Sequence, residues 1–86
     1  FVLEIVDDEI LLDHARAFAA RFSNASPEAI RLAKRAMGNA FEATRSEALD
    51  AEADAQAAAN ASAYHKAALE RFLAKEPALF DWDSAN

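Results

Sequence analysis

The chain has 86 residues, a net charge of −6 and no cysteine. The acidic balance argues against nucleic acid, because phosphate binding needs clustered Lys and Arg. Without cysteine there is no disulfide framework or thiolate metal site, and two isolated histidines make no metal site, so we expect a cytoplasmic protein without bound metal.

Residues 1–6, FVLEIV, are short, apolar and rich in β-branched side chains, a pattern typical of a strand. Nothing later in the chain resembles a second strand, and a lone strand leaves its backbone groups unpaired. The chain also opens within an apolar run and without methionine. We therefore expect this strand to belong to the core of a longer parent protein, in a part upstream of Phe1.

The rest of the chain is predicted to be all-α, with about four helices. Asp7 and Asp8 offer an N-cap and negative charge for a helix over 9–22. Its apolar stripe consists of Leu11, Ala15, Phe18 and Phe22, widened by Leu12 and Ala19. Ser26 and Pro27 predict the start of a second helix, with a stripe of Ile30, Ala33, Met37 and Phe41. Gly38 leaves open a break near Gly38 or Asn39.

A third helix is predicted over 46–61, because Thr44 and Glu47 have the spacing of a capping box. Its many alanines allow a neighbouring helix to approach closely. The last helix begins at the N-cap Ser62 and is closed by Lys75 and Pro77. Beyond it an apolar tail, Leu79, Phe80 and Trp82, is expected to pack on a neighbouring surface, and residues 83–86 are expected to be disordered. No apolar run approaches 18 residues, which argues against a membrane span.

Four groups of side chains are candidate sites. The carboxylates of the third helix are interpreted as a solvated face rather than as acid/base pairs; they are Glu47, Asp50, Glu52 and Asp54. Arg31, Lys34 and Arg35 share a helical face that suits an anion, although a solvated face or salt bridges to the third helix are favoured. His65 is assigned to capping or packing rather than catalysis, and His14 lies on the polar side of its helix.

Phe72 and Lys75 are the fourth group, three residues apart on the last helix. Such spacing puts an aromatic face and an ammonium on one side, as the adenine and a phosphate of a nucleotide would require. On spacing alone the alternative is favoured, in which Phe72 is core and Lys75 complements the helix dipole.

Three blocks of the sequence resemble the enoyl-CoA hydratase/isomerase (crotonase) family. The block that resembles the family's C-terminal helix and tail contains Ser62, His65, Phe72, Leu73, Lys75, Pro77 and Phe80. SPEAIRLAKRAM at 26–37 resembles the helix before it, and the run from Glu47 to Gln56 resembles the alanine-rich helix between the two. The family commonly has an acidic residue and a glycine at the positions of Ala67 and Ala68, and a basic residue at that of Glu76.

The resemblance implies that residues 1–86 are the C-terminal helical, trimerisation region of an α+β enzyme with the ClpP/crotonase-like fold. It implies a parent that hydrates or isomerises enoyl-CoA in fatty acid metabolism, as a homotrimer or a dimer of trimers. Phe72 and Lys75 then help to bind the coenzyme A of the acyl-CoA substrate, no cofactor is tightly bound, and no catalytic residue lies in this segment. The alternative is a free-standing acidic helical interaction module without enzymatic activity.

Overall fold

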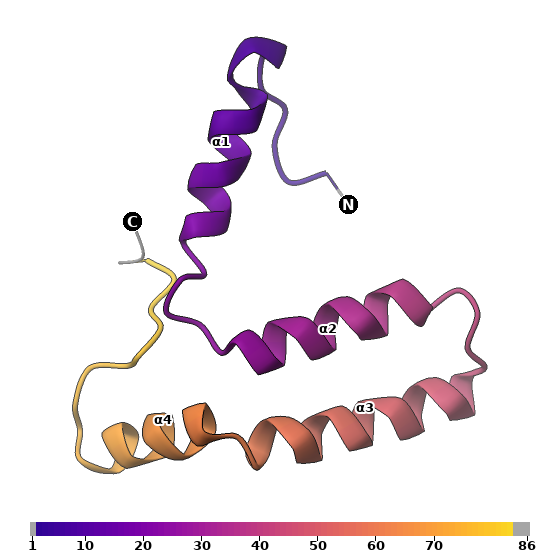
Figure 1. Ribbon diagram of the computed structural model, residues 1–86, viewed down its shortest axis with the longest axis vertical. Coiled ribbons are helices and arrows are strands. Elements are labelled where there is room, and N and C mark those ends of the chain that lie inside the picture. Colours follow the sequence, from indigo (N-terminus) through magenta and orange to yellow (C-terminus); the bar gives the residue numbers. More distant parts are fainter. Residues whose placement is uncertain (1, 84–86) are drawn as a thin grey trace. The chain divides into compact units, whose positions relative to one another are not determined.

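The computed structural model describes residues 2–83, which are all-α. Four helices follow one another: α1 (Asp8–Ala20), α2 (Pro27–Asn39), α3 (Arg45–Asn60) and α4 (Ala63–Leu73) (Figure 1). The chain divides into two compact units. Among the described residues, 2–24 and 80–83 belong to the first unit, and 25–79 form the second.

The predicted strand at 1–6 is not formed among the described residues. Phe1 lies outside them, and residues 2–6 have no regular secondary structure. Val2, Leu3 and Ile5 are exposed, Ile5 by 90%. A strand needs a second one to bond its backbone groups, and no segment of residues 2–83 supplies it. Pairing with a segment outside this sequence stays a prediction.

An aromatic cluster joins the end of α1 to the apolar tail within the first unit. It consists of Phe18, Phe22, Phe80 and Trp82. The ring of Phe22 lies 5.8 Å from Phe18, 6.1 Å from Phe80 and 5.3 Å from Trp82, measured between centroids. Mostly edge-to-face rings at such distances attract one another by about 0.5–1.5 kcal/mol per pair beyond the area they bury. The tail therefore packs on a helix of this same chain.

Arg21 packs against the aromatic cluster, over the ring of Trp82. Its guanidinium carbon lies 3.8 Å from the centroid of the Trp82 ring, and its Nη2 donates a hydrogen bond of 2.8 Å to the Trp82 carbonyl. These two residues are 61 positions apart in the sequence. A cation over an indole face contributes about 0.5–2 kcal/mol. At the end of the described chain, Asp83 lies in a turn, where its backbone N–H donates to Asp81; residues 84–86 of the predicted disordered tail lie outside the description.

The helices of the second unit begin at the predicted capping residues. Ser26 Oγ accepts from the backbone N–H of Ala29, and Ser62 Oγ accepts from that of His65, each at 3.1 Å. Thr44 and Glu47 form the full capping box, with both reciprocal hydrogen bonds at 3.1 Å. Each bond satisfies a backbone donor that has no partner within the helix. These start signals are local, and all three are confirmed.

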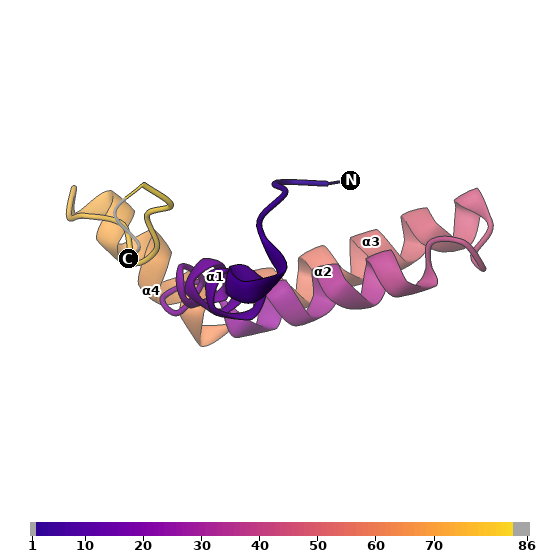
Figure 2. The same ribbon diagram turned by 90° about the horizontal axis from the view of Figure 1, so that it is seen from above.

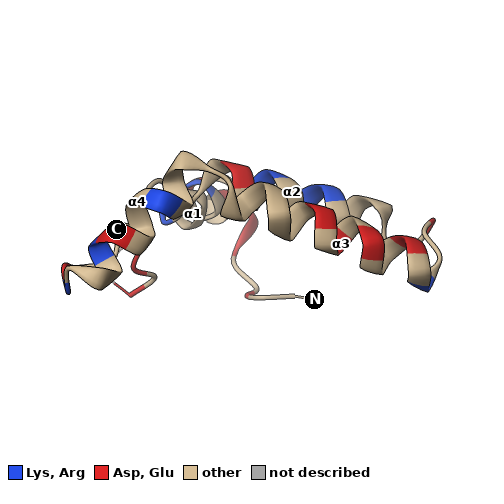
Figure 3. Cartoon of the chain, turned by 90° about the horizontal axis from the view of Figure 1, so that it is seen from below, with Lys and Arg blue, Asp and Glu red and all other residues tan. Residues whose placement is uncertain are grey.

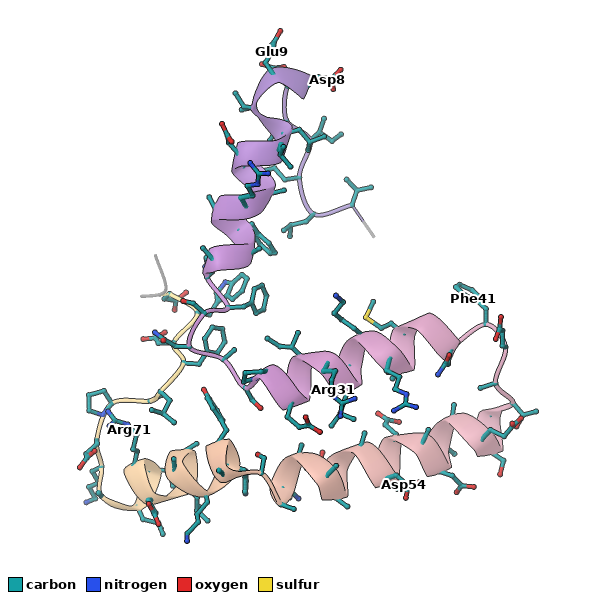
Figure 4. All side chains as sticks on the ribbon, viewed as in Figure 1. Asp8, Glu9, Arg31, Phe41, Asp54 and Arg71 are labelled. Carbon is teal, nitrogen blue, oxygen red and sulfur yellow. The ribbon has the colours of Figure 1, made fainter. Side chains whose placement is uncertain are left out.

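Within this unit α2 and α3 run antiparallel and side by side, and α4 follows α3 after a break at Ala61 and Ser62 (Figures 1 and 2). On α3 the half-buried side chains are Ala55 and Ala59, four residues apart and so on one helical face. Their small size permits close approach to a neighbouring helix, as the alanine-rich composition predicted. Phe41 was expected on the stripe of α2, but the helix ends at Asn39 and Phe41 is fully exposed in the turn (Figure 4).

No residue between 2 and 83 is buried. Large apolar side chains stay in contact with solvent on every helix, among them Leu11, Met37, Leu49 and Phe72. Hydrophobic burial is the main favourable term in folding, so the described chain lacks the usual source of stability of a small domain. In the described part of the chain, none of the helices has the length and apolar character needed to cross a membrane.

Candidate functional site at the end of the last helix

Helix α4 ends between Phe72 and Lys75, the predicted ligand-binding pair. Helix α4 stops at Leu73, with Ala74 as its C-cap. Lys75 lies beyond the helix with a φ of 59°, in the left-handed region. The helical spacing that was to place both side chains on one face therefore does not apply, because the helix does not extend to Lys75. Whether the pair binds a ligand stays a prediction.

The turn that contains Lys75 has the hydrogen bonds of a Schellman motif. The backbone N–H of Lys75 donates to the carbonyl of Phe72 at 3.1 Å, and that of Glu76 donates to the carbonyl of Arg71 at 2.9 Å. These bonds satisfy carbonyls that the helix leaves unpaired. Glycine usually occupies the left-handed position, because the Cβ of any other residue costs roughly 1–2 kcal/mol there. Lysine stands at this position at the expense of stability.

Arg71, which the sequence analysis did not single out, holds this turn from the side. Its Nε donates a hydrogen bond of 2.8 Å to the carbonyl of Pro77, and its Nη1 lies 3.2 Å from the carboxylate of Glu76. Figure 4 shows Arg71 at the end of α4 beside the segment that follows. In the sequence, a basic residue in the last turn that is followed five positions later by a glutamate was the pattern from which this ion pair could have been predicted. A partly exposed ion pair contributes about 0–1 kcal/mol, so its main effect is on geometry.

Phe72 and Lys75 are both open to solvent. The Phe72 ring is 76% exposed, so within this chain it does not serve as the core residue of the alternative interpretation. Lys75 is exposed as well. An exposed aromatic ring and a nearby ammonium can stack on a base and attract a phosphate. The two side chains therefore offer the groups that binding of a nucleotide would need.

The other candidate groups are distributed over two helices of opposite charge. Figure 3 shows Lys and Arg on α2 and Asp and Glu on α3. The four carboxylates of α3 named above are exposed, as the solvated-face interpretation predicted. Among residues 2–83 no group of His, Asp and Glu is arranged to hold a metal ion.

The basic residues of α2 make no ion pair with α3 in the described part of the chain. Arg31 instead binds Glu28 on its own helix, with Nη2 at 2.7 Å and Nε at 3.3 Å from the two carboxylate oxygens. This hydrogen bonding lowers the pKa of Glu28 and raises that of Arg31. In the capping box, the hydrogen bond from the backbone N–H of Thr44 is the main cause of a lowered pKa of Glu47. Lys34 and Arg35 are exposed.

The two histidines have local roles. The backbone N–H of His65 donates to the N-cap Ser62, and its side chain is exposed, so it takes part in the cap through its backbone. His14 Nε2 lies 2.8 Å from Glu4 Oε2 and ties residues 2–6 to α1, a contact that the sequence analysis missed.

Comparison of the chain with models of protein families, with curated proteins and with solved structures finds no match.

Proposed function

We propose that this chain is the C-terminal helical region of a crotonase-family enzyme that acts on acyl-CoA thioesters. The observation that carries the proposal is the order and spacing of the three sequence blocks, which overlap the three helices α2, α3 and α4 in turn. SPEAIRLAKRAM coincides with α2 from its N-cap Ser26, and the run from Glu47 to Gln56 lies within α3. The last block starts at the N-cap of α4 and includes its C-terminal turn.

In this proposal the segment serves oligomerisation and part of the coenzyme A site. The exposed apolar side chains on the helices support the first role, because such surface favours contact with another subunit, here in a homotrimer or a dimer of trimers. Phe72 and Lys75 supply the second role, by stacking on adenine and by attracting the 3′-phosphate of the substrate's coenzyme A. The chemistry, a hydration or isomerisation, belongs to residues outside this segment. The proposed compartment is the cytoplasm.

The Lys75→Ala substitution in the complete enzyme tests the site. An exposed charge pair contributes about 1 kcal/mol or less, so the KM for crotonyl-CoA should rise up to about fivefold at low salt. The kcat should stay nearly unchanged, as expected when binding is lost equally in the ground state and the transition state. Crotonyl dephospho-CoA, which lacks the 3′-phosphate, should show no effect. Lys66→Ala is the matched control, because Lys66 is also exposed and lies in α4.

Equal KM values for the wild type and the Lys75→Ala enzyme at low salt would remove Lys75 from the site. The Phe72→Ala substitution provides an independent arm. Base–aromatic stacking contributes about 1–3 kcal/mol, so its loss should raise the KM for both substrates alike.

The second candidate is the free-standing acidic helical module. The aromatic cluster favours it, because the apolar tail finds a partner within this chain instead of requiring another protein. Sedimentation and thermal melting of the 86-residue chain separate the candidates. The enzyme-segment proposal predicts self-association or a broad, low-temperature melt, whereas a sharply melting monomer at micromolar concentration would favour the module. The segment proposal also expects no turnover of crotonyl-CoA by this chain alone.

A further inference from the structure

We propose that Arg71 is a positioning residue for the Lys75 site: it fixes the turn that directs the Lys75 ammonium toward the phosphate of the ligand. This inference rests on the proposed function. The inference adds to the proposed site a residue that neither the periodicity nor the resemblance indicated. It follows from the contacts at the end of α4.

The direction of Lys75 is set by the turn and not by the helix. Its backbone is left-handed, with a φ of 59°, whereas the helix has already ended at Leu73. A lysine has no intrinsic preference for this conformation. It persists when surrounding contacts impose it, and a residue held in a sparsely populated conformation is a signal of function. The contacts that impose it are therefore part of the site.

Arg71 supplies contacts to the two residues that follow Lys75. Its backbone carbonyl accepts from the N–H of Glu76 at 2.9 Å, and its guanidinium binds the Pro77 carbonyl at 2.8 Å and the Glu76 carboxylate at 3.2 Å. Lys75 lies between the helix end and these two anchored residues. Without the guanidinium, the residues after Lys75 are held by the backbone hydrogen bonds alone, and the turn can open.

Arg71 and Lys75 differ in whether their positive charge is paired with a carboxylate. The Arg71 guanidinium is engaged by Glu76, and its side chain is 35% exposed. Among residues 71–77, Lys75 is the cation without a carboxylate partner, and it is exposed. A phosphate that approaches this turn therefore meets the Lys75 ammonium, while the Arg71 guanidinium stays bound to the Glu76 carboxylate and the Pro77 carbonyl.

The guanidinium fork is what the turn requires. Arg71 reaches the Pro77 carbonyl through Nε and the Glu76 carboxylate through Nη1 at the same time. The single nitrogen of a lysine cannot reproduce this planar fork, although it keeps the charge. The Arg71→Lys substitution therefore separates positioning from net charge.

The experiment measures KM and kcat in the complete enzyme, with crotonyl-CoA and crotonyl dephospho-CoA at low salt. The enzymes compared are the wild type, Arg71→Lys, Lys75→Ala and the double variant, with Lys66→Arg as the control on an exposed position of the same helix. We expect Arg71→Lys to raise the KM for crotonyl-CoA several-fold, by no more than Lys75→Ala does, at unchanged kcat. The dephospho substrate should show no effect, and the double variant should be no worse than Lys75→Ala alone, because both act through one ammonium.

A second measurement follows the turn itself, so that the inference does not depend on kinetics alone. In the complete enzyme, the Glu76 amide should exchange with solvent several-fold faster in Arg71→Lys than in the wild type or in Lys66→Arg. Unchanged exchange would show that the guanidinium does not hold the turn, and would overturn the inference.

The kinetic outcomes distinguish this inference from the proposed function. If Lys75→Ala raises the KM and Arg71→Lys does not, the positioning role is wrong and the Lys75 site stands. If Arg71→Lys penalises both substrates equally, Arg71 supports the region in general, and the inference is again wrong. If Lys75→Ala leaves the KM for crotonyl-CoA unchanged, the proposed Lys75 site is wrong, and the positioning role of Arg71 is wrong with it.

Discussion

The Phe22→Ala substitution tests whether the aromatic cluster attaches the tail to α1. Phe22 is half-buried and its ring contacts those of Phe18, Phe80 and Trp82. Truncating a fully buried phenylalanine costs about 3–5 kcal/mol, so a half-buried one should cost about 2 kcal/mol. Three ring contacts at about 0.5–1.5 kcal/mol each lead to a similar value. About 2 kcal/mol is roughly a 30-fold change in the ratio of attached to detached tail.

The assay uses Trp82, the single tryptophan of the chain, as the reporter. It is 39% exposed in the structure, with Arg21 over its ring. In the 86-residue chain, Phe22→Ala should shift its emission toward that of a solvated indole and increase its quenching by acrylamide. The loss of fixed aromatic packing should also reduce the near-UV circular dichroism signal.

The matched control is Phe41→Ala, because Phe41 is 101% exposed and no ring contact involves it in the described part of the chain. An exposed site of this kind should change stability by less than about 0.5 kcal/mol. If Phe22→Ala and Phe41→Ala leave the emission and quenching of Trp82 equally unchanged, the aromatic cluster does not hold the tail, and the reasoning from ring contacts is refuted.

Three further predictions concern the helix ends. Thr44→Ala should cost about 1 kcal/mol of helix stability by removing the N-cap acceptor, and far-UV circular dichroism should show less helix; an unchanged spectrum would speak against the capping box. The lowered pKa of Glu47 predicts stability that is fully present above the ordinary glutamate pKa of about 4.3 and is lost as the pH falls through the lower native value. Acid titration of helix content should show this loss in the wild type and not in Glu47→Gln. Lys75→Gly should raise stability by up to about 1 kcal/mol, because relief of roughly 1–2 kcal/mol of left-handed cost outweighs the entropy cost of glycine, about 0.5–1 kcal/mol. A lower melting temperature for this variant would show that the Lys75 side chain stabilises the turn.

The sequence alone determined the class of the chain and where three helices begin. Ser26, Thr44 and Ser62 were each predicted as N-caps, and each accepts the expected hydrogen bond at 3.1 Å. These predictions succeed because an N-cap depends on a few neighbouring residues, whose hydroxyl and backbone groups are in reach whatever the rest of the chain does. Two helix ends were predicted less well: α1 stops at Ala20 and not at Phe22, and α4 at Leu73 and not near Lys75. The end of α2 at Asn39 agrees with the break that Gly38 left open.

The partners of the tail and the surroundings of Lys75 depended on the tertiary structure. Periodicity places Phe18 on a helix face and Trp82 in an apolar tail, but it carries no information on which distant residues meet. That choice depends on the summed packing of rings and of Arg21 across 61 positions of sequence. Lys75 shows the same limit at short range. A lysine at a left-handed position runs against local preference, and the contacts of Arg71 with Glu76 and Pro77, which accompany it, become visible when the chain is folded.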